Sequence, residues 1–329
     1  MKKSAYLLIG LGTCYLKGLY ALPQKNVLNY SAGIGTPITT STTETLARGE
    51  WSVNQRMEYY RARPLADLEL AQSSLLESQS GDFVNYFMLS YGISNNLTLG
   101  TSLPIQAIYK LQGVNTIPSI TMPPVINLGN PSGLADLTFF GLWRLVDHET
   151  AFPLSTALLL GVNTPTGKTN ARTRIGTLFS VTDQPGSGAW TPFGGIIFSK
   201  NLRELSWSSN IVYTQTLKGT QKTILGSLFD YNIAVVHHLF ADNNDKQEDY
   251  TLDGILELTG EYAAKDKIAG ISDSNSGGNL LLLAPGLRIN VKSIFSCYLG
   301  FTVPISETLY GRQPKTKFGV LSGIDINLS

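Results

Sequence analysis

Between Tyr250 and Tyr262, apolar and polar side chains alternate at every second position. The even-numbered positions carry Tyr, Leu or Gly, whereas the odd-numbered positions include the carboxylates of Asp253, Glu257 and Glu261. Because successive residues of a β-strand point to opposite faces, the segment predicts a strand with one apolar and one charged face. A sheet packed on a soluble core also alternates in this way. The tyrosine at each end of the apolar face favours a strand that runs between two membrane interfaces.

The same alternation recurs along the chain and predicts an even number of strands, about twelve, as in bacterial single-chain barrels. The predicted strands are 49–61, 82–93, 96–108, 133–146, 150–163, 188–200, 203–217, 224–240, 248–263, 278–291, 293–306 and 315–328. The links between them are short and long in turn, which is typical of a barrel with tight turns at one end and large loops at the other. Link 218–223 is short for a large loop, and Pro285 inside a strand predicts a bulge.

Composition favours a membrane location for this sheet. Charged residues make up 15% of the chain, against roughly 25% in soluble domains. No apolar run after the N-terminus approaches the roughly 20 residues of a spanning helix. We therefore expect an all-β protein, a transmembrane antiparallel β-barrel over residues 49–329, with the lipid bilayer as its partner. The net charge of +1 gives no reason to expect a nucleic-acid partner.

The N-terminus predicts export. Lys2 and Lys3 precede a short apolar run, 5–12, which is the pattern of a signal peptide, and we expect cleavage after residue 21. Residues 22–48 are rich in Ser, Thr and Gly and lack a consistent period. They are interpreted either as a flexible periplasmic lead or as a plug inside the barrel.

Motifs that carry chemistry are weak. Segment 161–169 resembles a phosphate-binding loop but has five residues where that motif needs four. His237 and His238 are adjacent on a predicted strand and point to opposite faces, so they do not chelate one ion together. We expect no catalytic residue, no metal site and no cofactor, and the chain is not predicted to be an enzyme.

Charged side chains inside the predicted strands mark the barrel lumen, because an Arg or Lys facing lipid costs roughly 2–4 kcal/mol at the midplane. They pair into networks that fill the barrel, or they line a water-filled path and set its selectivity. The predicted lumen residues are Arg56, Glu58, Asp136, Arg144, Asp230, Asp253, Glu257, Glu261, Arg288 and Asp325.

Five stretches in the first half of the chain resemble one bacterial family when they are taken in order. They are 37–46, 49–53, 91–100, 133–137 and 161–167. The family is the outer-membrane β-barrel family labelled for the meta-pathway of phenol degradation, which is similar in outlook to long-chain fatty-acid transporters. The resemblance implies a single barrel that passes small molecules, hydrophobic or aromatic ones among them, across the outer membrane.

These observations together predict a monomeric channel or transporter of the bacterial outer membrane that works by passive diffusion of a small-molecule permeant. The alternative is a structural or surface-interaction barrel that conducts nothing. A barrel hydrolase that uses His238 is a third hypothesis.

Overall fold

The computed structural model of this chain describes residues 29–30, 35–72, 76–114, 125–147, 154–202, 204–241 and 250–328. The predicted signal peptide, residues 1–21, lies outside this range, as do the predicted strand starts at 150 and 248. In the part of the chain that the structure describes, no helix is long and apolar enough to cross a membrane.

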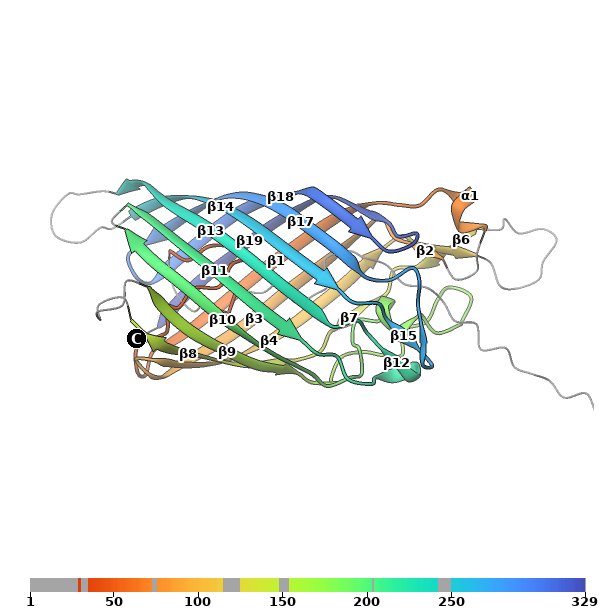
Figure 1. The fold of residues 1–329 in the computed structure, drawn as a ribbon, viewed down its shortest axis with the longest axis horizontal. Helices are drawn as coiled ribbons and strands as arrows, with labels where there is room; N and C mark the ends of the chain where they lie inside the picture. Colours follow the sequence, from red (N-terminus) through yellow and green to blue (C-terminus); the bar gives the residue numbers. More distant parts are fainter. Residues whose placement is uncertain are drawn as a thin grey trace, which may run out of the picture.

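Strands wrap around a single long axis and are tilted against it (Figure 1). Within the described residues, twelve of the thirteen strands of the main sheet form a closed ring, and β7 (Ser132–Leu134) pairs only with β4. The ring closes because β1 pairs with both β3 and β19, and all neighbours are antiparallel. The predicted transmembrane-type antiparallel barrel is confirmed. Its strands are β1 (Trp51–Arg63), β3 (Gly81–Ser94), β4 (Leu97–Tyr109), β8 (Thr138–Val146), β9 (Ser155–Asn163), β10 (Thr191–Leu202), β11 (Leu205–Thr214), β13 (Leu228–Ala241), β14 (Tyr250–Ala263), β17 (Gly278–Val291), β18 (Phe295–Leu309) and β19 (Lys315–Leu328).

The outer face of the barrel is apolar and the inner face is mixed. On β14, Leu256 is 51% exposed and Tyr262 is 42% exposed, whereas Asp253, Glu257 and Glu261 are buried. Aromatic side chains gather near both ends of the outer face, as they do at the two interfaces of membrane barrels. One group is Trp51, Tyr91, Trp143, Phe240 and Tyr250, and the other is Tyr59, Tyr109, Tyr213, Phe229 and Tyr262. The side-chain sorting predicted from the period of two is therefore present.

The two ends of the barrel differ as predicted. Tight turns join β3 to β4, β10 to β11 and β17 to β18 at one end, which we call the short-turn end. The long connections at the other end carry small elements of their own and form two three-stranded sheets. These elements are α1 (Asp67–Leu70), β2 (Glu77–Ser78), β5 (Leu111–Val114), β6 (Val125–Gly129), η1 (Val181–Asp183), η2 (Thr220–Lys222), β12 (Thr223–Ile224), β15 (Lys267–Ile268) and β16 (Ile271–Ser272).

Three details differ from the prediction. The predicted strand 133–146 is interrupted, because residues 135–137 lie outside β7 and β8. The connection between β11 and β13 runs from 215 to 227, longer than the predicted 218–223. The predicted bulge at Pro285 is wrong, because the pairing of β17 with β18 keeps one register on both sides of that residue and shifts instead between Leu281 and Leu282.

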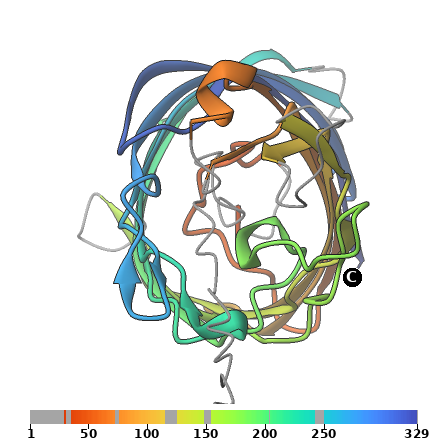
Figure 2. The ribbon, with the colours of Figure 1, turned by 90° about the vertical axis from the view of Figure 1, so that its right-hand side faces the viewer.

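An N-terminal segment lies inside the ring (Figure 2). We call its described residues, 29–30 and 35–46, the plug. Ile38 and the hydroxyl-bearing residues that follow it are buried in the lumen. The plug enters β1 at the short-turn end, where Gly49 N–H donates to Gly92 O at 2.8 Å and Gly92 N–H donates to Glu50 O at 2.9 Å. The described residues of 22–48 thus lie inside the ring, and the role of the segment as a lead or a plug stays a prediction.

Candidate functional site

One side of the lumen is lined by charged residues. We call it the charged wall, and it consists of inward-facing side chains of β1, β14, β17 and β19. Arg56 pairs with Glu58, its neighbour on the same face of β1. Arg288 of β17 pairs with Asp325 of β19, on the other side of β18. The Arg288 guanidinium also lies 4.5 Å from the centre of the Tyr298 ring. The residues of the charged wall are Arg56, Glu58, Asp253, Glu257, Arg288 and Asp325, all of them buried.

The charged wall binds the backbone of the plug. Glu257 accepts hydrogen bonds from the N–H groups of Thr39 and Thr40 at 3.0 and 2.9 Å. Arg56 donates to Ile38 O, and Arg288 donates to Pro37 O at 3.3 Å. Carboxylates thus bind amide donors and guanidinium groups bind carbonyl acceptors. Because charged partners make the stronger hydrogen bonds, this wall anchors the plug.

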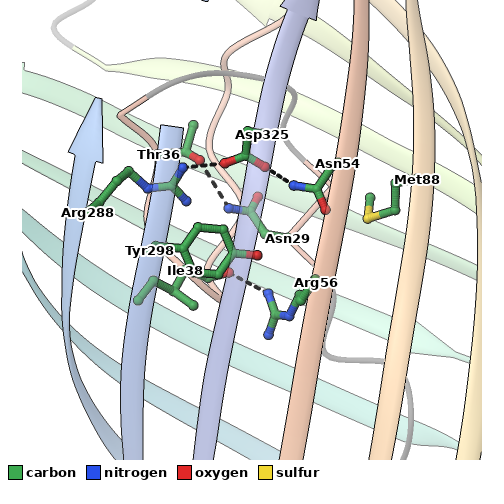
Figure 3. Close-up of a pocket in the computed structure, with 9 residues that line it drawn as sticks. All are labelled: Asn29, Thr36, Ile38, Asn54, Arg56, Met88, Arg288, Tyr298 and Asp325. Carbon is green, nitrogen blue, oxygen red and sulfur yellow. Dashed lines mark hydrogen bonds and ion pairs between the residues drawn. The ribbon is translucent and has the colours of Figure 1, made fainter. Parts of the chain in front are cut away.

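Little space remains between the plug and the charged wall (Figure 3). A small cavity there has room for about one water molecule. Asn54 and Arg288 both donate to Asp325 at its edge, and Asn29 donates to Thr36 at 3.4 Å. The lining residues are Asn29, Thr36, Ile38, Asn54, Arg56, Met88, Arg288, Tyr298 and Asp325. At this level the plug fills the charged side of the barrel.

The opposite side of the lumen is apolar. We call it the apolar wall, and it consists of inward-facing side chains of β3, β8, β9, β10 and β11. Together with Tyr30 of the plug they form one buried cluster. The members of the apolar wall are Val84, Tyr86, Met88, Phe140, Leu142, Ala157, Leu159, Phe193, Ile197 and Val212.

A row of glycine and phenylalanine crosses the apolar wall. Gly100, Phe140, Gly161 and Phe193 are register partners on β4, β8, β9 and β10. A Cβ atom on Gly100 would lie 2.3 Å from Phe140 Cζ, and one on Gly161 would lie 2.2 Å from Phe193 Cζ. Such contacts are too short for carbon atoms, so the tip of each ring occupies the space that a side chain on the neighbouring glycine would fill. We call the surface of the two rings the aromatic shelf.

Tyr30 rests on the aromatic shelf. Its ring centre lies 5.0 Å from that of Phe140 in an edge-to-face arrangement and 5.2 Å from that of Phe193 in a stacked one. Both geometries are favourable for aromatic pairs. The side chain is 4% exposed, and its backbone N–H donates to Ser41 Oγ at 3.0 Å.

The structure brings most of the predicted lumen residues onto the inner face. Asp253 accepts from Asn290 Nδ2 at 2.7 Å and lies 2.6 Å from His238 Nδ1. Asp230, on β13, is 3% exposed. Arg144 is at the short-turn rim, where it donates to Asn95 O at 2.9 Å. That these side chains line a conducting path stays a prediction.

Asp136 is placed elsewhere. It lies in the break between β7 and β8, where its carboxylate accepts from the N–H groups of Gly167 and Ser187 at 2.9 and 2.8 Å. It therefore joins two connecting segments at the long-loop end, the break between β7 and β8 and the connection between β9 and β10, away from the charged wall. The partners of its carboxylate are distant in sequence, so no local pattern could have shown them.

The apolar wall was missed by the sequence interpretation, although a signal for it exists. Residues 157–162 of β9 and 196–198 of β10 are apolar at every position, so the alternation is lost there. A strand with a continuous apolar run is buried on both faces. This run could have indicated an apolar surface inside the barrel as well as outside.

The described residues contain no group of three or more His, Cys, Asp and Glu side chains arranged to hold a metal ion. His237 and His238 do point apart: the first contacts Glu204 O at 3.1 Å and the second contacts Asp253.

Comparisons with known proteins show a similar fold in solved structures but no related sequence. No protein-family model matches the chain, and no curated protein sequence matches it. Among solved structures, the chain is similar to the COG4313 outer membrane channel from Pseudomonas putida F1, with a TM-score of 0.59 and 9% identity over 87% of this chain and 98% of that one. It is less similar to the NanC porin, with a TM-score of 0.46 and 10% identity over 84% and 100% of the two chains.

Proposed function

We propose that this protein is an outer-membrane channel or transporter that passes small hydrophobic or aromatic molecules by passive diffusion. The observation that carries the proposal is the divided lumen, in which an N-terminal plug lies between a charged and an apolar wall. A closed barrel with an apolar exterior satisfies its backbone in lipid. The similar barrel from Pseudomonas putida F1, which is described as an outer membrane channel, supports the same interpretation.

The orientation follows from the two ends. Tight turns of bacterial barrels face the periplasm and long loops face outside, so the plug enters the lumen from the periplasmic side. The complete ring closes on itself within one chain, and we propose that the protein acts as a monomer, without catalysis.

Passage through the barrel requires the plug to move. The bonds described above join its backbone to wall side chains, and water can replace each partner once the lumen is hydrated. Because water takes over these hydrogen bonds, the net cost of release is far below their sum. The plug is therefore held firmly enough to close the barrel and loosely enough to leave.

A non-conducting structural barrel is the second candidate. The filled region beside Arg56 and Arg288, with room for about one water molecule, favours it. In that case the plug is a permanent part of the core.

Single-channel recording in a planar bilayer separates the two. We expect rare openings from the full chain and frequent, uniform conductance steps from a variant that lacks residues 29–46. Heat-modifiable migration in gels and circular dichroism establish that the variant is a folded barrel. A folded variant that stays silent contradicts the channel and favours the structural barrel.

A further inference from the structure

The aromatic shelf holds one ring. Phe140 contacts Tyr30 in an edge-to-face arrangement and Phe193 in a stacked one, at centroid distances of 5.0 and 5.2 Å. Gly100 and Gly161 leave room for the two phenylalanine rings. The other members of the buried hydrophobic cluster that includes the two rings are Leu, Ile, Val and Ala side chains, Met88 and Tyr86. A side chain of the plug is the present occupant, and it enters the seat from a segment that is not part of the barrel.

An acceptor lies beside the seat. Asp230 faces the lumen from β13, directly across from Val212 of the apolar wall. Its Oδ1 atom is buried and has no hydrogen-bond partner in the part of the chain that the structure describes. The Asp230 carboxylate interacts electrostatically with the Tyr30 phenol. A buried acceptor without a donor costs about 1–3 kcal/mol, so a ligand hydroxyl at this point would be favoured.

We propose that the aromatic shelf and Asp230 form a binding subsite for a phenol-type permeant, a small aromatic molecule with a ring hydroxyl, and that Tyr30 occupies the subsite until such a molecule displaces it. The ring packs against Phe140 and Phe193 and its hydroxyl donates to Asp230. The role of this subsite in transport rests on the proposed channel function, whereas the binding itself does not.

Other ligand classes fit the seat less well. A sugar needs a polar partner for each of its several hydroxyl groups, whereas the buried cluster that holds Tyr30 is formed by hydrophobic side chains. A long acyl chain needs an extended groove, whereas the row of Gly100, Phe140, Gly161 and Phe193 cups a single ring. The seat combines two aromatic rings with the buried acceptor of Asp230, which matches one ring and one hydroxyl.

Binding of 4-fluorophenol to the purified barrel tests the proposal. The probe is followed by fluorine NMR in octyl glucoside, a detergent without rings. The Tyr30→Ala variant empties the seat, and we expect saturable binding about tenfold tighter than in the full wild-type chain, where Tyr30 competes. Fluorobenzene, which has no hydroxyl, is expected to bind roughly 10- to 100-fold more weakly than 4-fluorophenol. Asp230→Ala in the same background is expected to remove this preference.

The neighbouring residues Phe139 and Phe140 provide a matched control, because they lie on opposite faces of β8 and Phe139 is exposed on the outside. In the Tyr30→Ala background, Phe140→Leu should weaken 4-fluorophenol binding roughly 2- to 10-fold, and Phe139→Leu should leave it unchanged. Lack of saturable binding to folded Tyr30→Ala protein overturns the proposal, as does equal weakening by both leucine variants. Binding without conductance in the plug-deleted barrel would refute the channel and keep the subsite. Conductance without binding would refute the subsite and keep the channel.

Discussion

The two walls of the lumen hold the plug in different ways. The charged wall binds its backbone through Glu257 and Arg56, and apolar residues on the same strands pack around one plug side chain, that of Ile38. The apolar wall contacts one ring, that of Tyr30, and depends on its shape. The difference teaches that charge-assisted binding of the plug backbone and packing of an aromatic plug ring occur at different places in the lumen. Changes on the charged wall should affect stability and the position of the plug, whereas changes on the apolar wall should affect what can replace Tyr30.

The largest effect is expected when the charged wall loses one member of a buried pair. Arg288→Met leaves Asp325 buried without its cation, which should lower the free energy of unfolding by about 3–5 kcal/mol. Urea unfolding in lipid vesicles measures it. The double variant Arg288→Met, Asp325→Leu should recover most of the loss, and a single variant as stable as the wild type would contradict the pairing.

A smaller effect is expected from Glu257→Gln, which replaces a charged acceptor of two plug amides by a neutral one. Hydrogen bonds to charged groups contribute about 1.5–3 kcal/mol. The amides of Thr39 and Thr40 should therefore exchange hydrogen roughly 10- to 100-fold faster. Glu261→Gln, on the same inner face of β14, is the control and should leave exchange at these amides unchanged. Equal acceleration by both variants would mean that the anchor lies elsewhere.

A substitution on the apolar wall tests the packing of the aromatic shelf. Gly100→Ala places a Cβ atom 2.3 Å from Phe140 Cζ, so the ring must move and its packing against Tyr30 is disturbed. Overpacking costs about 1–3 kcal/mol, and we expect the lower end because the obstacle is the far end of a side chain. Gly141→Ala faces outward against Leu99 and should cost less. Urea unfolding compares the two, and a larger loss for Gly141→Ala would contradict the shelf geometry.

The smallest effect is expected outside both walls, as a pH-dependent change in the packing of the loop between β14 and β17. Burial raises the pKa of Asp266 to about 7, the nearby charge of Asp273 adds to this, and the Gly226 N–H opposes it. Because its folded pKa is above the ordinary value, packing of this loop is strongest below about pH 4 and weakens as pH rises through 7. A spin label at Ser274 should become more mobile at pH 8 than at pH 5.

Asp266→Asn should remove this pH dependence and leave the plug amides unaffected. A label whose mobility is the same at both pH values in the wild type would contradict the assignment.

The barrel could be predicted because alternation is a local property of each strand. The strand from 278 to 291 was predicted with its observed ends, and Asp253 and Glu257 were placed on the inner face correctly. The interruption at 135–137 could not be predicted, because it depends on Asp136 accepting from Gly167 and Ser187, which only the folded chain brings near.

The division of the lumen into a charged wall and an apolar wall could not be predicted from the sequence. Alternation sorts residues into inner and outer faces but does not show which strands face each other across the lumen. The partners of Glu257 are amides of Thr39 and Thr40, which carry no side-chain signal. The seat of Tyr30 depends on register between β4, β8, β9 and β10, and register is a long-range property.

The junction at Gly49 and Gly92, where the N-terminal segment is fastened to the barrel, makes Tyr30 a tethered competitor. A short tether holds such a group at an effective concentration on the order of millimolar. A free ligand displaces Tyr30 only when its concentration, relative to its dissociation constant, exceeds the effective concentration of Tyr30 relative to the dissociation constant of that ring. In the proposed channel, the tethered ring returns after the molecule departs, so permeation is expected only above a threshold concentration of the permeant.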